Sequence, residues 1–170
     1  MLNTAIIRAW VGVILCGSLI GARPAGADPV VHWNTVASTA VATATAAGRP
    51  SPATALDFAM VHAAVHDAVQ AIVKRYEPYH QEIAGASGSA AAATAKAAHD
   101  VLMHLFPGQA TFLETSYATF FADNGLALHD PGVLVGQQAA GGIINLRLHD
   151  GRFPATVPPF TGGTGVGEWR

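Results

Sequence analysis

The sequence predicts an all-α protein built as a bundle of about five helices. Apolar residues recur at helical spacing, most clearly over residues 51–76. No segment shows the strict polar–apolar alternation of a half-buried strand. Proline and glycine residues divide the chain into stretches of helix length. We therefore expect one helical domain over residues 28–153, followed by a Pro/Gly-rich connector over residues 154–170.

Residues 1–27 have the features of a secretory signal peptide. Arg8 supplies a positive charge, residues 9–20 form an apolar run, and Ala25-Gly26-Ala27 has the small-x-small pattern of a cleavage site. The apolar run is shorter than the ~20 residues that a membrane-spanning helix needs. We expect the leader to be removed and the mature protein to be exported, to the periplasm or out of the cell. Cys16 leaves with the leader, so no disulfide is expected in the mature chain.

The charge of the mature chain bears on its partners. Removing the leader leaves seven Lys and Arg residues against eleven Asp and Glu residues, a net charge of −4. This balance gives no reason to expect nucleic acid or an anionic membrane as a partner. Charged residues make up 12% of the full chain, which is about half of the usual fraction. We therefore expect either tight packing through alanine faces or a partner that covers part of the surface.

The first two predicted helices are separated by Gly48-Arg49-Pro50. The first runs over residues 33–47 and is rich in Thr, Ala and Val. The second runs over residues 51–76, and Pro52 stands at an early position where its missing N–H costs nothing. The apolar stripe of this second helix consists of Phe58, Val61, Val65, Ala68 and Ile72.

Three further helices complete the predicted bundle. The third is alanine-rich and covers residues 89–106, and the fourth covers residues 109–122 and carries several aromatic side chains. The fifth covers residues 130–149. It contains small residues spaced to let another helix approach closely, namely Gly136, Ala140 and Gly141.

His62 and His66 are candidate metal ligands of low specificity. They lie four residues apart on the second helix, so both project from one face and could share a metal ion. Asp67 is rotated by about 100° from His66 and cannot easily join them. No glutamate follows His62, so the pair is not the His-Glu-x-x-His arrangement of metalloproteases. We favour two interface histidines that bond to backbone or carboxylate groups, since a metal site would need a third ligand from elsewhere.

No other motif indicates an active site. His99 and His104 do not share a helix face, and the default interpretation for these and the other histidines outside the pair is a surface position near a helix end. The glycine run over residues 162–167 lacks the Gly-Lys-Ser/Thr ending of a phosphate-binding loop. Neither a Gly-x-Ser-x-Gly elbow nor a pair of carboxylates for acid–base work is present. We therefore assign no catalytic or cofactor-binding residue in this chain.

Four stretches of the chain carry a family resemblance. Three are Val31–Asn34, Ala63–Val69 and Asn145–Phe153. The fourth and most specific is Pro-Phe-Thr-Gly-Gly-Thr-Gly-Val-Gly-Glu-Trp-Arg at residues 159–170. In this order and spacing they resemble the N-terminal half of bacterial vanadium-dependent haloperoxidase-like proteins, relatives of the type 2 phosphatidic acid phosphatases (the PAP2 superfamily). The resemblance covers nearly the whole mature chain.

The resemblance implies a helical half that packs against a second helical bundle carrying an oxyanion site. In the family, that second bundle grips vanadate or phosphate through a lysine and an arginine, a Ser-Gly-His stretch, and an arginine followed by a histidine. Vanadate supports peroxide-driven halide oxidation, and phosphate chemistry is ester hydrolysis. None of these motifs occurs here. The chain is thus expected to be an N-terminal fragment, inactive alone, whose partner is the missing C-terminal half or another helical protein.

The matching positions are expected to have structural roles. His66 and Asp67 should tie the second helix to its neighbours, and Arg147 and Asp150 should organise the turn into the connector, where Trp169 is also assigned a structural role. One rival interpretation is a stand-alone secreted helical module for binding or interaction. Another is a small metal-binding protein that uses the two histidines of the second helix.

Overall fold

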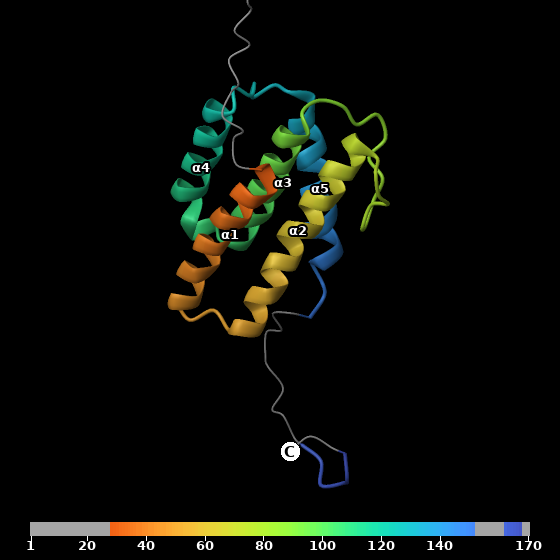
Figure 1. The fold of residues 1–170 in the computed structure, drawn as a ribbon. Helices are drawn as coiled ribbons and strands as arrows, with labels where there is room; N and C mark the ends of the chain where they lie inside the picture. The colour runs from red at the N-terminus through yellow and green to blue at the C-terminus, as the bar shows by residue number, and fades with distance from the viewer. Residues whose placement is uncertain (1–27, 152–161, 168–170) are drawn as a thin grey trace, which may run out of the picture.

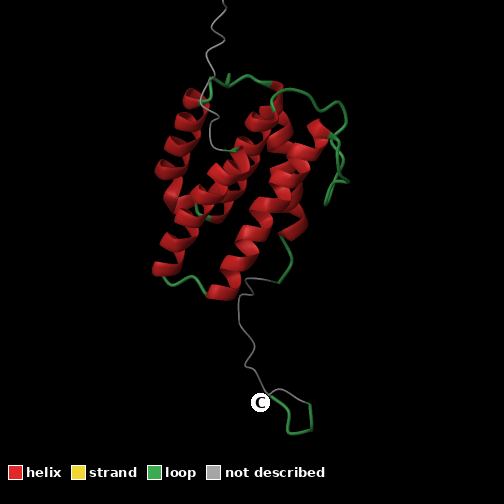
Figure 2. Ribbon diagram, viewed as in Figure 1, coloured by secondary structure: helices red, strands yellow, loops and turns green. Residues whose placement is uncertain are grey.

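The computed structural model describes residues 28–151 and 162–167. These residues form an all-helical structure without strands, as the sequence predicts (Figures 1 and 2). The predicted signal peptide, residues 1–27, and most of the predicted connector lie outside the described residues. The elements are α1 (Pro29–Ala46), α2 (Ser51–Val73), α3 (Ala90–Leu105), the 3-10 helix η1 (Pro107–Gln109), α4 (Ala110–Asp123) and α5 (Pro131–Arg147).

Local capping explains where the helix ends differ from the sequence expectation. The first helix begins at Pro29 rather than near residue 33, because the carboxylate of Asp28 accepts hydrogen bonds from the backbone N–H groups of Val30 and Val31. The second helix ends at Val73 rather than near residue 76, because Lys74 adopts a left-handed conformation with a φ of 55°. The other ends lie within two residues of the predicted positions.

Helix α3 is the centre of the bundle. It packs against α1, α2, α4 and α5. Figure 1 shows these helices around it. Five alanines in the first part of α3 are excluded from solvent, which lets the neighbouring helices come close to its backbone there. The apolar stripe predicted on α2 faces this core, with Val61, Val65 and Ala68 buried and Phe58 and Ile72 partly buried against it.

Helices α3 and α5 approach each other closely at Gly136. A Cβ atom built on Gly136 would lie 2.4 Å from the carbonyl oxygen of Ala93 and 2.9 Å from the backbone nitrogen of Ala97. Ala140, one turn later, is also buried. Gly141 differs, because a Cβ there would meet nothing within 4 Å. Of the three small residues predicted to admit another helix, Gly136 meets the backbone of α3, Ala140 is buried, and Gly141 has open space beside it.

One carboxylate connects the starts of α3 and α5. Oδ1 of Asp130 accepts the backbone N–H of Gly132 at 2.7 Å, which caps α5, and the backbone N–H of Ser89 at 2.8 Å. The Ser89 hydroxyl in turn caps α3 through the N–H of Ala92. The starts of α3 and α5, which pack closely at Gly136, are therefore also joined to each other by hydrogen bonds.

We predict opposite effects for alanine at two glycines of α5. Gly136→Ala should lower the free energy of unfolding by about 1–3 kcal/mol, because the new methyl group meets the backbone of α3. Gly141→Ala, the matched control in the same helix, should raise it by about 0.5–1 kcal/mol, because only the helix propensity changes. Urea unfolding of both variants measures the difference, and equal effects would contradict the packing described here.

Candidate functional site

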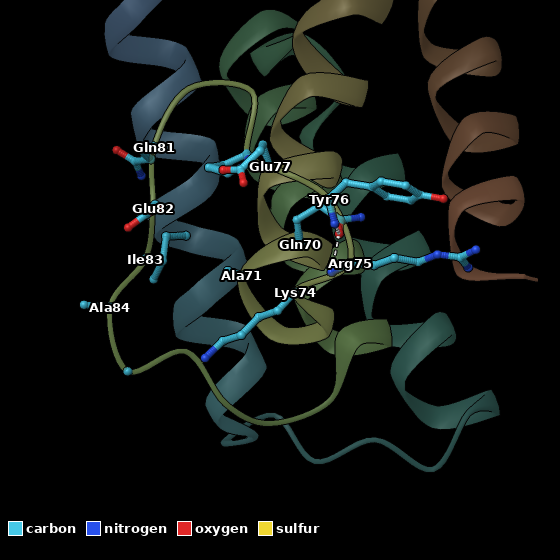
Figure 3. Close-up of a pocket in the computed structure, with 12 residues that line it drawn as sticks. Gln70, Ala71, Lys74, Arg75, Tyr76, Glu77, Gln81, Glu82, Ile83 and Ala84 are labelled. Atoms are coloured by element: carbon cyan, nitrogen blue, oxygen red, sulfur yellow. Dashed lines mark hydrogen bonds between the residues drawn. The ribbon is translucent and has the colours of Figure 1, made fainter.

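The segment between α2 and α3 borders an open cavity of about 650 Å³ (Figure 3). The chain leaves α2 through the left-handed Lys74 and folds back beside the helix before α3 begins (Figure 1). The cavity is lined on one side by the last turn of α2, including Gln70 and Ala71, and on the other by residues 74–78 and 81–85. It is thus built from one helix end and the loop that follows it.

Buried Asp67 holds this loop against α2. Its Oδ1 accepts the backbone N–H of Tyr79 at 2.5 Å, and its Oδ2 accepts the N–H groups of His80 at 3.1 Å and Gln81 at 3.4 Å. Asp67 is 0% exposed, so these N–H groups take the place of water around the carboxylate. Nε2 of His66 lies 2.9 Å from the carbonyl oxygen of Glu77 and so donates to it. The two residues expected to tie α2 to its neighbours lie against the loop that follows it.

Two glutamine side chains extend the same anchoring. Oε1 of Gln70 accepts the backbone N–H groups of Arg75 and Tyr76 at 3.2 and 2.9 Å (Figure 3). Nε2 of Gln81 donates to the carbonyl oxygen of Gln138 at 2.9 Å, which joins the loop to α5. The cavity therefore has walls fixed from α2 and α5.

The charges around the cavity are of both signs. Lys74 and Arg75 point in different directions in Figure 3, and Glu77 and Glu82 also line the wall. A site for vanadate or phosphate needs cationic donors that converge on one point. The side chains at this cavity do not converge in that way, so they do not fit an oxyanion.

His62 and His66 do not converge on a metal position. Nε2 of His62 lies 3.0 Å from the side-chain oxygen of Asn34 on α1, whereas Nε2 of His66 bonds the loop carbonyl of Glu77. Among the described residues, no group of three or more His, Cys, Asp and Glu side chains is placed to hold a metal ion. Each imidazole instead bonds an oxygen of a neighbouring element, as in the interface interpretation that the sequence favours.

A second hollow, of about 510 Å³, lies where α3 and α5 end. Nε of Arg147 bonds Oδ2 of Asp150 at 2.9 Å, so these two residues shape the turn after α5. Arg49, also on the wall, donates two hydrogen bonds to buried Asp57 at 2.5 and 2.7 Å. Basic side chains at helix carboxyl ends balance the helix dipoles. Trp169 lies outside the described residues.

His99 is buried, which corrects the default expectation of a surface histidine. It is 5% exposed, between Trp33 of α1 and Tyr117 of α4, with ring centroids 6.5 and 4.7 Å away. Its Nδ1 lies 2.9 Å from Oδ1 of Asp100, which Lys96 also contacts at 2.9 Å. The sequence did not indicate this burial, because it depends on how α3 faces α1 and α4, and the alanine-rich run before His99 does not mark those faces.

The pKa values around His99 follow from burial and pairing. Burial alone raises the pKa of Asp100, but hydrogen bonds from His99 and Lys96 and the Lys96 charge outweigh it, so the net pKa lies below its usual value. Burial, followed by the charges of Asp100 and Glu114, raises the pKa of Tyr117 to about 12. Near neutral pH this carboxyl is therefore ionised and this phenol is protonated.

The outward side chains of α1 and α2, which we call the α1–α2 surface, carry no Asp, Glu, Lys or Arg. Helix α1 has none of these residue types, and the two in α2, Asp57 and Asp67, are both 0% exposed. Of the described helices, only α2 has the length and hydropathy of a membrane span, but it packs against α1, α3 and α5. Exposed members of the surface include Val31, Asn34, Thr35, Ser38, Thr39, Ala42, Pro52, Ala55, Leu56 and Ala59.

The hydroxyl groups on α1 are already satisfied within the helix. Those of Thr35, Ser38, Thr39 and Thr43 each donate to the carbonyl oxygen four residues earlier, at 2.8–3.1 Å. Covering these side chains by another protein would therefore leave no hydroxyl hydrogen without an acceptor. Removing the α1–α2 surface from water therefore has a low desolvation free energy.

Comparison with known proteins assigns no family to this chain. No family model matches it, and neither the curated proteins nor the solved structures give a significant match.

We predict that Asp67→Asn loosens the loop after α2. Asparagine offers one oxygen and turns an NH₂ group toward backbone donors, so the free energy of unfolding should fall by about 2–3 kcal/mol. Limited proteolysis should cut between residues 74 and 88 sooner than in the parent protein. Asp123→Asn, at an exposed position at the end of α4, is the control and should change neither property.

Proposed function

We propose that this chain is the N-terminal helical part of an exported protein of the vanadium-dependent haloperoxidase and type 2 phosphatidic acid phosphatase kind. In this proposal the chain supplies no catalytic residue. It acts by packing its α1–α2 surface against a second helical part, which carries the oxyanion site. The family resemblance of the four sequence stretches motivates the proposal, and the uncharged α1–α2 surface is the structural observation that supports it.

The lack of charge on this surface is unusual for a face exposed to water. Soluble domains place Lys, Arg, Asp and Glu at about a quarter to a third of their surface positions. The centres of protein interfaces, by contrast, are depleted in charged residues. Helix α4 keeps an ordinary charged face, with Glu114 and Asp123 exposed. Helix α5 carries one charged residue, Arg147, in its last turn. The contrast with α4, together with the hydroxyl groups already satisfied on α1, favours α1 and α2 as the side that a partner covers.

The small side chains of the surface suit a helical partner. Alanine, serine and threonine let two helix backbones approach closely, as Gly136 does between α5 and α3. An unfolded or extended partner would not need two parallel rows of small residues. The proposal therefore commits to a second helical part, joined to this chain or supplied as a companion.

The described basic side chains support placing the chemistry outside this chain. Lys96 and Arg147 are paired with Asp100 and Asp150, and Arg49 is paired with Asp57. The remaining pair, Lys74 and Arg75, diverges at the cavity wall beside acidic side chains (Figure 3). Vanadate or phosphate would be held by the second part, and we assign no reaction step to residues of this chain.

A secreted helical module that binds an unrelated protein is the second candidate. The same uncharged surface would serve it, so the two proposals differ in what the partner contains. The oxyanion proposal requires a partner with the Lys/Arg, Ser-Gly-His and Arg…His motifs. The module proposal requires only a protein with a complementary face.

We predict that activity needs both parts. The chain alone should neither hydrolyse p-nitrophenyl phosphate nor oxidise bromide with peroxide and vanadate. Expressed with the coding sequence that follows it, read in all frames, it should form a complex with one of these activities. Activity of the chain alone, or a following sequence without the oxyanion motifs, would contradict the proposal.

A charge on the α1–α2 surface should weaken the complex. Ala59→Lys places an ammonium group on the exposed face of α2, where the partner would have to desolvate it, so affinity should fall at least about tenfold. Ala118→Lys, on the exposed face of α4, is the matched control and should bind normally. Binding is measured by titration calorimetry. Equal affinities for the two variants would exclude this surface.

A further inference from the structure

Nε2 of His99 is a buried polar atom without a hydrogen-bond partner in the part of the chain that the structure describes. It faces Oε1 of Glu114, on α4, at 3.6 Å. The two side chains differ in exposure, since the side chain of His99 is nearly buried and that of Glu114 is 61% exposed. One atom is therefore fixed in the core, and the other sits on a side chain that can move.

The other ring nitrogen determines what Nε2 can do. Nδ1 of His99 lies 2.9 Å from Oδ1 of Asp100, and the low pKa of Asp100 keeps that carboxyl ionised. An ionised carboxylate only accepts hydrogen bonds, so Nδ1 must carry a hydrogen. In the neutral ring, Nε2 is then a bare lone pair that faces a carboxylate oxygen. Two acceptors meet there with no hydrogen between them.

The charges around the ring favour a proton at this position. Helix α3 contributes Lys96 and Asp100, and α4 contributes Glu114, which sum to one negative charge while the imidazole is neutral. Tyr117 of α4 stays protonated because its pKa is raised to about 12. Helix α1 contributes the uncharged Trp33. One proton added to the His99 ring brings the summed charge of His99, Lys96, Asp100 and Glu114 to zero. This offsets part of the free-energy cost of a buried imidazolium.

We propose that His99 and Glu114 form a proton-binding site that fastens α4 to α3. On proton uptake, Nε2–H donates to the Glu114 carboxylate, and a small movement of the exposed glutamate shortens the contact to about 2.8 Å. The buried lone pair and the carboxylate are satisfied together. Helix α4 packs chiefly against α3, with smaller contacts to η1 and a ring contact between Phe120 and Trp33 of α1. The bond between His99 and Glu114 would therefore strengthen the main contact of α4.

The pH dependence follows from the direction of proton uptake. A proton on Nε2 gains the Glu114 carboxylate as its acceptor only in the folded protein, because the two side chains are apart in the unfolded chain. The bond therefore adds stability where this proton is bound, at acidic pH, and adds none where the ring is neutral.

Glu114→Gln tests the site, because the amide can donate an N–H to Nε2 at any pH. The variant should be more stable than the parent protein near pH 8 and should lose this advantage near pH 5.5. Between these values the unfolding equilibrium constant of the parent should change about tenfold more than that of the variant. Glu82→Gln, an exposed control in the loop after α2, should follow the parent. If Glu114→Gln also follows the parent, the site does not exist.

Nitrogen-15 NMR of the His99 ring gives a second, independent result on the unmodified protein. At pH 8 the Nδ1–H tautomer should be present, and on acidification the signals should change to those of the imidazolium while the protein stays folded. An Nε2–H tautomer at pH 8 would overturn the proposal, because the proton would then already lie between His99 and Glu114 in the neutral ring.

Discussion

Close packing around the alanine face of α3 is the constraint on which the bundle depends. Ala92, Ala93, Ala97 and Ala98 are fully buried, and their single-carbon side chains let α1, α2, α4 and α5 surround one helix. Each alanine buries little apolar area, so close backbone contacts add to the larger buried side chains, such as Trp33, Phe120 and Leu113. Gly136 shows how little space remains, because α5 meets α3 there without room for a Cβ atom.

The acidic residues of α2 are buried with hydrogen-bond partners, which leaves the α1–α2 surface without charged side chains. Asp57 and Asp67 point inward from α2, where Arg49 and the backbone of the loop after α2 satisfy them. Asp130 likewise accepts backbone N–H groups, at the starts of α3 and α5. Because both acidic residues of α2 serve the interior, the α1–α2 surface has none. The inward position of Asp67 thus both anchors the loop after α2 and keeps the desolvation free energy of the α1–α2 surface low.

The sequence predicted the helices but only part of the candidate site. The apolar stripe from Phe58 to Ile72 predicts α2, and the Pro and Gly residues predict the ends of the five helices to within a few residues. These signals can be read from the sequence because they act locally. The burial of His99 depends on which side of α3 faces α4, and the alanine-rich first half of this helix does not mark that side. Asp67 is similar, since its partners lie 12 to 14 residues away in a loop without a periodic signal.

Hydroxyl-radical footprinting of the chain, alone and in complex with the second helical part, tests the central claim most directly. Leu56 on α2 and Val31 on α1 are both exposed and reactive. The account predicts that both become protected in the complex, whereas Leu134 on α5 and Phe112 on α4 keep their reactivity. Unchanged oxidation of Leu56 and Val31, with protection of the α4 or α5 side chains instead, would contradict it.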